Sequence, residues 1–337
     1  MIISRTPFRI SFFGGGTDYP AFYEENGGAV LSTSINKYCY ITCRYLPPFP
    51  FFEYKYRIRY TKREETYTIA EIQHPSVREC LNFVDLDNRG VEIQHNADLP
   101  AMSGLGSSSA FTVGLLQALY ALKGKMTTKR QIALDAIHIE QDIIKENVGS
   151  QDQTTSAFGG FNKIEFGGPQ KITVYPVTIK PEKLEHLQNH LMLIFTGLPR
   201  NTNASDIAGE QIKRTPEKKA ELKAMKAMVE EAINILDDSR DRLTDFGKLL
   251  HESWQIKRSL TPHITNPSID EIYETGMRAG ASGGKLLGAG GGGFILFFVR
   301  PELQPKVKEK LGKLLRVPFS FESLGTQIIY YAPENNF

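Results

Sequence analysis

The sequence is poor in cysteine and contains no long apolar run. Three cysteines stand among 337 residues, an odd and sparse number that excludes a disulfide framework and suits a reducing compartment. No apolar stretch approaches the roughly 20 residues that a membrane-spanning helix needs. Residues 1–5 lack the apolar core and cleavage site of a signal peptide. We therefore expect a soluble, cytoplasmic protein with no membrane partner.

An excess of charge of one sign is also absent. Lysine and arginine total 40 against 38 aspartates and glutamates, which leaves a formal net charge of +2. A general polyanion binder needs clustered positive charge, so we expect no nucleic-acid partner. The composition, 41% hydrophobic and 23% charged, is that of a folded globular chain, and the length allows about two domains.

The pattern of apolar and turn residues predicts an α+β protein. A charged stretch at residues 181–190 predicts the boundary between an N-terminal domain, residues 1–185, and a C-terminal domain, residues 186–337. Runs rich in β-branched and aromatic residues predict strands at residues 2–13, 31–45, 91–97, 161–166, 191–195 and 294–299. Apolar periodicity and capping signals predict helices at residues 110–123, 128–147, 215–237 and 268–280.

Glycine is abundant, and it falls into three dense clusters at residues 14–16, 104–106 and 288–293. The second cluster continues into three serines and then into a predicted helix. Such a loop can point backbone N–H groups at a phosphate, and the helix N-terminus adds a positive dipole end. It is not a Walker A loop, because no Gly-Lys-Ser/Thr follows. The alternative is a Ser/Gly-rich linker that happens to precede a helix. The residues concerned are Gly104, Leu105, Gly106, Ser107, Ser108 and Ser109.

Two carboxylates follow this loop. Glu140 falls in the middle of an apolar helix face that includes Ala133 and Ala136, where an unpaired charge is costly. It is therefore a metal ligand, a functional group or half of a structural ion pair. Asp152 lies in a predicted loop after that helix, where it is either a general base for phosphoryl transfer or a turn residue.

The first glycine cluster also stands between two charged residues. Arg9 lies inside the first predicted strand, and Asp18 follows the three glycines. Arginine can steady phosphate charge, and aspartate can hold sugar hydroxyls. The alternatives are an edge-strand arginine and an Asx turn.

Together these segments resemble the three motifs of the GHMP kinases, the galacto-, homoserine, mevalonate and phosphomevalonate kinases. Residues 100–110 resemble the family's phosphate loop, and residues 285–294 resemble its C-terminal glycine motif. Glu140 and Asp152 have the spacing of its metal-binding glutamate and proposed base. The resemblance implies a two-domain fold with the site between the domains. The N-terminal domain would be like ribosomal protein S5 domain 2, and the C-terminal domain would be a ferredoxin-like α/β sandwich.

Within the family, residues 5–19, 157–162 and 195–200 resemble the kinases of heptose 7-phosphate, and are close to the L-fucokinase type. Galactokinases carry a Glu-His pair where this chain has Gly15 and Gly16, which would leave room for a larger sugar. The resemblance implies transfer from ATP, with Mg²⁺, to the anomeric hydroxyl of a heptose 7-phosphate. The 1,7-bisphosphate would feed nucleotide-activated heptose for bacterial surface glycans.

The resemblance also implies roles for individual residues. Asp152 and Arg9 would be catalytic, residues 104–109 would bind the ATP phosphates, and Ser108 and Glu140 would hold Mg²⁺. For the phosphate of the sugar, Arg200 and Lys163 are the candidate cations, and the alternative is that both are ordinary surface cations. The partners would be ATP and a sugar phosphate, in a monomer or homodimer. Rival readings are a fucokinase-like sugar kinase and a catalytically silent sugar sensor. The residues expected at the substrate are Gly15, Gly16, Thr17, Asp18, Gly197, Arg200, Gly290 and Gly291.

Overall fold

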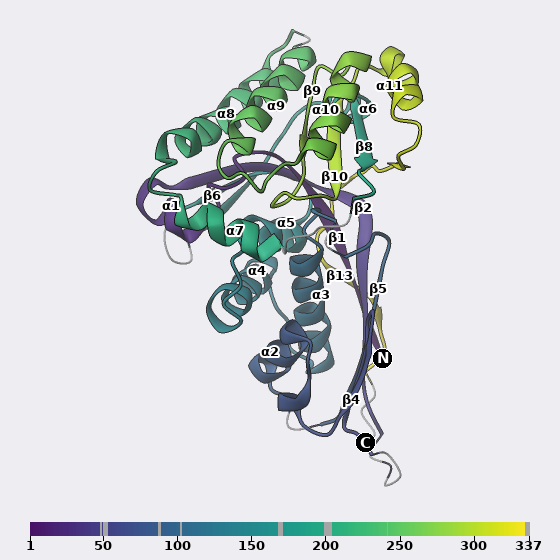
Figure 1. The fold of residues 1–337 in the computed structure, drawn as a ribbon. Helices are drawn as coiled ribbons and strands as arrows, with labels where there is room; N and C mark the ends of the chain where they lie inside the picture. The colour runs from purple at the N-terminus through teal and green to yellow at the C-terminus, as the bar shows by residue number, and fades with distance from the viewer. Residues whose placement is uncertain are drawn as a thin grey trace.

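The computed structural model places two antiparallel-rich sheets one above the other, with helices packed on both (Figure 1). It describes residues 1–47, 49, 53–86, 89–101, 103–167, 171–198, 204–240 and 242–333. Within these residues, no helix is both long and apolar enough to span a membrane.

In the described part of the chain the larger sheet has nine strands and is built around the long antiparallel pair β1 (Ile2–Phe13) and β2 (Gly28–Tyr45). Its main order is β13-β1-β2-β5-β3-β4, and β12, β6 and β7 branch from β2. β3 and β5 pair in parallel, whereas the other pairs are antiparallel. The remaining strands are β3 (Tyr56–Arg59), β4 (Arg63–Thr66), β5 (Val91–Ala97), β6 (Phe161–Phe166), β7 (Ile172–Pro176), β12 (Phe321–Glu322) and β13 (Gln327–Tyr331).

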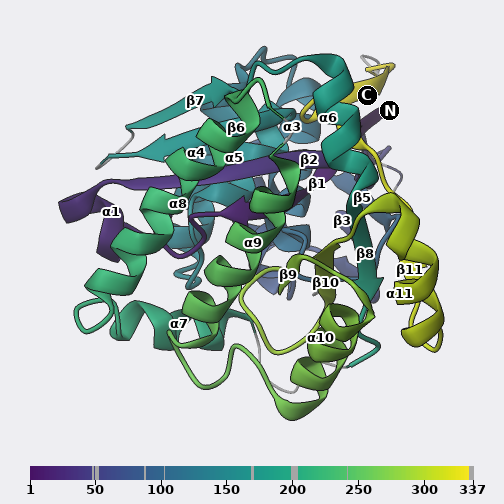
Figure 2. The same ribbon diagram turned by 90° about the horizontal axis from the view of Figure 1, so that it is seen from above.

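Helices cover both faces of β1, whose last eight residues are all buried. α3 (Ser107–Leu122) and α5 (Gln151–Phe158) contact β1 and β2 from one side. α8 (Lys219–Asp237) and α9 (Leu243–Arg258) cross over the same strands, as the view from above shows (Figure 2). Further out lie α1 (Pro20–Asn26), η1 (Ile69–Glu71), α2 (Pro75–Val84), α4 (Lys129–His138) and α7 (Ala204–Lys213).

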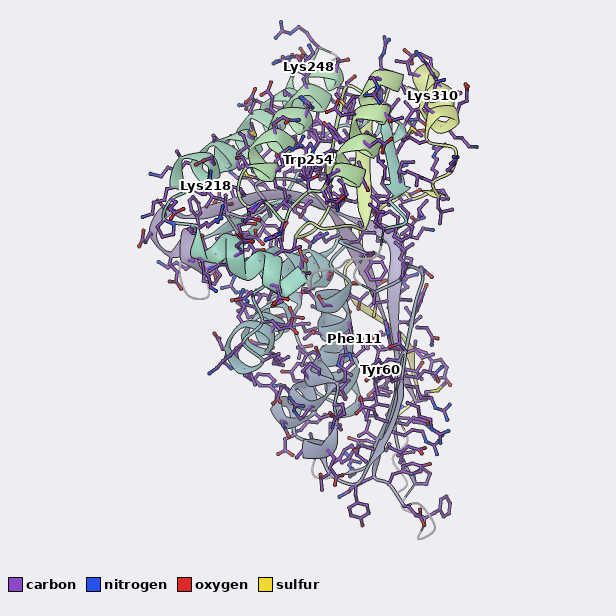
Figure 3. The ribbon with its side chains drawn as sticks, in the orientation of Figure 1. Tyr60, Phe111, Lys218, Lys248, Trp254 and Lys310 are labelled. Carbon is purple, nitrogen blue, oxygen red and sulfur yellow. The ribbon has the colours of Figure 1, made fainter. Side chains whose placement is uncertain are left out.

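The smaller sheet, as far as the structure describes it, has four strands in the order β11-β8-β10-β9. Trp254 of α9 is fully buried beside it, whereas Lys218, Lys248 and Lys310 point outward (Figure 3). Its elements are α6 (Pro181–Asn189), β8 (Leu191–Phe195), α10 (Pro267–Ala279), β9 (Gly283–Leu286), β10 (Phe294–Phe298), η3 (Pro301–Leu303), α11 (Gln304–Lys310) and β11 (Arg316–Val317).

Apolar contacts also join α3 to the lower part of the large sheet. Phe111 of α3 and Tyr60 lie between the helix and the strands (Figure 3). The ring of His74 stands between them, stacked on Phe111 with a centroid separation of 4.8 Å and edge-on to Tyr60 at 4.9 Å. These contacts fix the axis of α3, whose N-terminus carries the second glycine cluster.

Four predicted strands, at residues 2–13, 91–97, 161–166 and 191–195, coincide with observed ones, but the helix predicted at residues 128–147 does not continue. α4 ends at His138 and is followed by a π-helical turn, Ile139–Ile143. The wider turn rotates the following residues, and Ile143 is exposed. Asp135 of α4 is buried and accepts a hydrogen bond from the Tyr120 hydroxyl.

The two-domain boundary stays a prediction. The charged stretch expected to be a junction forms α6. β12 and β13, near the end of the chain, pair with β2 and β1 of the large sheet. Membership of the two sheets therefore does not divide simply at residue 185.

Candidate active site

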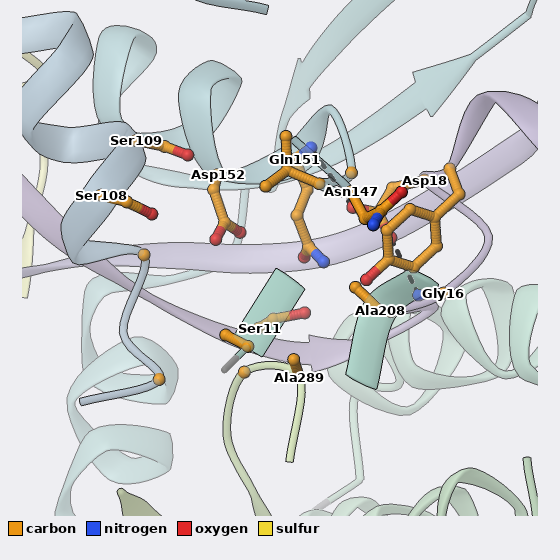
Figure 4. A pocket seen from close by; sticks show the side chains of 18 of the residues that line it. Ser11, Gly16, Asp18, Ser108, Ser109, Asn147, Gln151, Asp152, Ala208 and Ala289 are labelled. Carbon is orange, nitrogen blue, oxygen red and sulfur yellow. Dashed lines mark hydrogen bonds between the residues drawn. The ribbon is translucent and has the colours of Figure 1, made fainter. Parts of the chain in front are cut away.

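The three glycine clusters meet around a cavity of about 240 Å³ (Figure 4). Its walls come from β1 and the loop after it, the loop into α3, and the segment between the π-helical turn and α5. α7, α9, β9 and the loop after β9 close the other side. The elements that line it are thus far apart in sequence and are brought together by both sheets.

The loop into α3 lies against the third glycine cluster. Gly104 and Gly106 take left-handed backbone angles, with φ of +83° and +74°, which favour glycine. A Cβ on Gly288 would lie 2.6 Å from the Gly104 Cα, so this close approach also requires glycine. Leu105 is buried and its carbonyl accepts a hydrogen bond from the Arg9 backbone N–H. Gly104, Gly106 and the three serines line the cavity, but Leu105 does not.

Arg9 and Asp152 form a bidentate ion pair at this loop. Arg9 Nε donates to Asp152 Oδ1 at 2.7 Å, and Nη2 donates to Oδ2 at 2.8 Å. Arg9 Nη1 donates to the Gly104 carbonyl at 2.8 Å. A Cβ on Gly106 would lie 3.3 Å from Asp152 Oδ2. One arginine therefore fixes the carboxylate beside the phosphate loop.

The sequence predicted a loop at Asp152, and that prediction is wrong. Asp152 occupies the first turn of α5, where the helix dipole stabilises negative charge. Figure 4 shows its carboxylate pointing from α5 toward the space below Ser108 and Ser109.

Glu140 is buried, as predicted, in the π-helical turn. It accepts hydrogen bonds from Ser109 Oγ at 2.8 Å and from Gln153 Nε2. Glu140 makes no ion pair with any residue that the structure describes, which argues against the structural ion pair, and its Oε1 has no partner. Burial raises its pKa to about 7, and the hydrogen bonds from Ser109 and Gln153 offset part of that rise. An unsatisfied, buried carboxylate oxygen fits a cation ligand.

Glu140 is not placed directly beside Ser108, the residue predicted to hold Mg²⁺ with it. Ser109, not Ser108, is the serine that bonds to Glu140. Ser108 is exposed and lines the cavity, whereas Glu140 lies behind Ser109 and outside the lining. No cluster of three or more His, Cys, Asp or Glu that could hold a metal occurs in the part of the chain that the structure describes. A metal here would need hydroxyl and phosphate oxygens as additional ligands.

Two lysines that the sequence reasoning missed also line the cavity. Lys285 of β9 is 2% exposed and donates to the Phe12 carbonyl at 2.8 Å. Burial, with repulsion from Lys257 and Arg9, holds the pKa of Lys285 well below its usual value. Lys257 of α9 donates to the Gly288 carbonyl. For Lys285 the available signal was a lone charge just before Leu286 and Leu287. Lys257 carried no such signal, because α9 contains several other charged residues.

Asp18 occupies the opposite end of the cavity, next to the first glycine cluster. Its Oδ1 accepts from the Gly16 N–H at 2.8 Å, and its Oδ2 accepts from the Gln151 N–H at 3.4 Å. Burial, and then the neighbouring Asp152, raises the pKa of Asp18. Gly15 and Gly16 line the cavity beside it.

The structure does not bring Thr17 or the far glycines to the cavity. The Thr17 hydroxyl is buried and donates to the Gly14 and Ala29 carbonyls. The glycine loop after β9 reaches the cavity through Gly288 and Ala289, so the substrate-binding role predicted for its later members gains no support. Those members are Gly290, whose Cβ would meet the Ile264 backbone, and Gly291, which donates its N–H to the Ile264 carbonyl.

Lys163 and Gly197 are also separate from the described cavity. Gly197 is exposed, and among the described residues beyond its chain neighbours no atom lies within 4 Å of where its Cβ would be. Lys163 forms ion pairs with Glu165 and Glu230, and it does not line the cavity. Arg200 lies outside the described residues, so its role stays a sequence prediction.

Two family models match this chain, one in its N-terminal half and one in its C-terminal half. Residues 73–160 match the family model of the GHMP kinases N terminal domain, and residues 217–317 match that of the GHMP kinases C terminal. A D-glycero-alpha-D-manno-heptose 7-phosphate kinase of Campylobacter jejuni is 30% identical over 326 residues, covering 89% of this chain and 90% of that protein. A bifunctional fucokinase/GDP-fucose pyrophosphorylase of Arabidopsis thaliana is 24% identical over 334 residues. The match covers 90% of this chain but 31% of the Arabidopsis thaliana protein.

Solved structures show the same fold. The structure of a D-glycero-D-manno-heptose 1-phosphate kinase from Bacteriodes thetaiotaomicron has a TM-score of 0.79 and 22% identity, covering 98% of this chain and 99% of that one. That of Lactococcus lactis galactokinase complexed with galactose has a TM-score of 0.71 and 19% identity, covering 97% and 94%. The α+β fold class and the dependence of the enzyme on ATP are thereby confirmed: the chain belongs to the GHMP kinase family.

Proposed function

We propose that this sugar kinase transfers the γ-phosphoryl group of ATP to the anomeric hydroxyl of D-glycero-D-manno-heptose 7-phosphate, giving the 1,7-bisphosphate. The carrying observation is the Asp152 carboxylate, which Arg9 holds beside the phosphate loop, where a Cβ on Gly106 would lie 3.3 Å from Asp152 Oδ2. The substrate is proposed from the similarity to the heptose 7-phosphate kinase of Campylobacter jejuni. The product would serve nucleotide-heptose and surface glycan synthesis.

Asp152 would accept the proton of the attacking hydroxyl. A general base must lie within hydrogen-bond reach of that proton and next to the electrophile. The two hydrogen bonds from Arg9 fix both carboxylate oxygens in one plane, and the third fixes the guanidinium to Gly104. Arg9 thereby orients the base, and its charge also faces the phosphoryl group in transit.

The backbone of residues 104–109 would hold the ATP phosphates at the N-terminus of α3. Ser108 would meet Mg²⁺ directly, because its side chain lines the cavity. Glu140 would approach the same ion through its unpartnered Oε1. When bound, Mg²⁺ would neutralise charge on the phosphates.

Lys285 and Lys257 bring two more basic groups to the same place. Three basic side chains, Arg9, Lys257 and Lys285, line the described cavity together with the carboxylates Asp18, Glu146 and Asp152. Both lysines are nearly fully buried, and burial of like charges is costly unless an anion joins them. We therefore propose that they face the transferring phosphoryl group. Arg200 remains the proposed partner of the 7-phosphate, with Asp18 binding sugar hydroxyls.

A second candidate is a sugar 1-kinase for an unphosphorylated sugar such as fucose, which the similarity to the Arabidopsis thaliana protein favours. A sugar sensor without catalysis is the third. The paired Arg9 and Asp152 next to the phosphate loop argue against a sensor, since binding alone does not require that arrangement.

The test is an assay of ADP release with a panel of sugars and sugar phosphates, including heptose, heptose 7-phosphate, fucose and galactose. We expect the highest kcat/KM for heptose 7-phosphate. Equal values for heptose and heptose 7-phosphate would shift the assignment to the fucokinase-like candidate. No sugar-dependent ADP release, with ATP binding intact, would favour the sensor.

A further inference from the structure

Three buried polar atoms in the cavity wall have no hydrogen-bond partner among the residues that the structure describes. They are Ser11 Oγ, Gln151 Oε1 and Gln211 Nε2. Their residues are 5%, 9% and 5% exposed, and all three line the cavity. Buried polar groups without partners are uncommon in folded proteins, so three in one wall point to a ligand.

The three side chains converge on the Gly15-Gly16 step from different elements. A Cβ on Gly15 would lie 3.6 Å from Ser11 Oγ and 3.7 Å from Gln151 Nε2. A Cβ on Gly16 would lie 2.4 Å from Gln211 Nε2. Ser11 comes from β1, Gln151 from α5 and Gln211 from α7. In Figure 4 the side chain of Gln151 points from α5 toward the strand that carries Ser11.

This arrangement gives Gly15 and Gly16 a different role from the one expected from the sequence. The sequence suggested that the absence of side chains at Gly15 and Gly16 leaves room for a larger sugar. At Gly16 the Gln211 amide occupies that room, whereas at Gly15 a Cβ would make ordinary contacts with Ser11 and Gln151. The glycines thus expose neutral hydrogen-bonding groups from neighbouring elements.

We propose that Ser11, Gln151 and Gln211 form the subsite that binds the hydroxyl groups of the acceptor sugar through hydrogen bonds. This inference rests on the proposed function, because it assumes that the acceptor binds in this cavity. Ser11 can donate and accept, Gln151 offers a carbonyl acceptor, and Gln211 offers an amide donor. A sugar hydroxyl both donates and accepts, so adjacent hydroxyls can pair with such a set. The three residues are specificity-determining residues; Asp152 and Arg9 act on the reacting atoms.

A ligand-reading role and a structural role predict opposite effects on stability. A buried polar group without a partner destabilises the empty protein, so its replacement by an apolar group of similar size stabilises it. A group that serves the fold does the reverse. Binding of the acceptor, by contrast, loses one hydrogen bond with each replacement.

The variants are Gln151→Met, Gln211→Met and Gly15→Ala, with Gln94→Met as the control because Gln94 is exposed on β5. Gly15→Ala adds a methyl group between Ser11 and Gln151 at ordinary contact distances, so it tests the subsite even if a glutamine variant misfolds. The measurements are the melting temperature without ligand, the Kd for ATP, and the KM for D-glycero-D-manno-heptose 7-phosphate.

We expect each glutamine variant to raise the KM for the sugar phosphate about threefold to tenfold, the scale of one neutral hydrogen bond. The melting temperature should stay equal or rise, and the Kd for ATP and all properties of Gln94→Met should not change. An unchanged KM in all three cavity variants overturns the inference. So does a lower melting temperature in both glutamine variants with unchanged KM.

The proposed function can fail separately. If the unaltered protein does not phosphorylate heptose 7-phosphate but does phosphorylate another sugar of the panel, the proposed substrate is wrong. The same variants are then measured with that sugar, and the same outcomes decide the inference. The melting temperatures need no substrate and decide between a ligand-reading and a structural role even if no sugar of the panel reacts.

Discussion

Replacement of Asp152 by asparagine tests the chemistry at the centre of the cavity. Asparagine keeps the shape of the side chain, but it cannot accept the proton of an attacking hydroxyl. Loss of a general base lowers kcat by about 10²–10⁴-fold, which corresponds to about 3–5 kcal/mol in the activation barrier. We expect this fall for Asp152→Asn, with the Kd for ATP little changed.

The same substitution also affects stability, and its size follows from the ion pair. Arg9 donates to both oxygens of Asp152, and the arginine side chain is 4% exposed while that of Asp152 is 24% exposed. The amide leaves one acceptor and directs an N–H₂ group at the guanidinium. A lost charge-assisted hydrogen bond costs about 1.5–3 kcal/mol, and the partial exposure of Asp152 favours the lower end of that range.

The assay is coupled ADP release at saturating sugar phosphate, with chemical denaturation of the same samples. Asp206→Asn is the matched control, since Asp206 also lies in the first turn of a helix, α7, and is exposed outside the cavity. It should retain both kcat and stability. Turnover like that of the unaltered protein in Asp152→Asn would refute the base and leave Asp152 as a positioning group.

Four further predictions concern the metal, the pH dependence of stability, Lys285 and the acceptor phosphate. Glu140→Gln should weaken Mg²⁺-dependent ATP binding in a titration; an unchanged titration curve would remove Glu140 from the metal site. Burial raises the Glu140 pKa from 4.5 to about 7. Between pH 4.5 and pH 7 the Glu140 carboxyl is therefore protonated in the folded metal-free protein but ionised in the unfolded chain. The protein's free energy of unfolding should therefore fall by about 3 kcal/mol as the pH rises through that window, and Glu140→Gln should lack that fall. Lys285→Met should lower kcat/KM about tenfold to a hundredfold, whereas Lys248→Met, an exposed lysine of α9, should not; equal activity of both variants would contradict the role of Lys285. Arg200→Ala should raise the KM for the sugar phosphate tenfold to a hundredfold with the KM for ATP unchanged, and a KM that stays the same would exclude Arg200 as the phosphate partner.

The sequence predicted those features of the site that depend on residues close together in the chain. The loop at residues 104–109 could be read because its glycines precede an apolar helix. Arg9 stood out because a charge inside an apolar strand requires a partner, and that partner proved to be Asp152. Burial of Glu140 followed from the apolar positions before it, which lie in α4 with ordinary periodicity.

The remaining features depend on contacts between distant segments. A π-helical turn adds a residue to one turn, and the apolar spacing of residues 133–144 carries no sign of it. Lys163 had the same local appearance as a phosphate-binding cation, but Glu230 of α8 pairs with it. Gln211 enters the cavity from α7, and no spacing within the sequence relates it to Gly16.

Phosphorus NMR of the reaction product tests the central claim most directly. The protein is incubated with ATP, Mg²⁺ and D-glycero-D-manno-heptose 7-phosphate, and the new phosphorus resonance is correlated with the sugar protons. We predict a single new phosphate coupled to the anomeric proton, formed together with an equal amount of ADP, while the 7-phosphate stays in place. A phosphate at any other position, or faster product formation from the unphosphorylated heptose, would contradict the account.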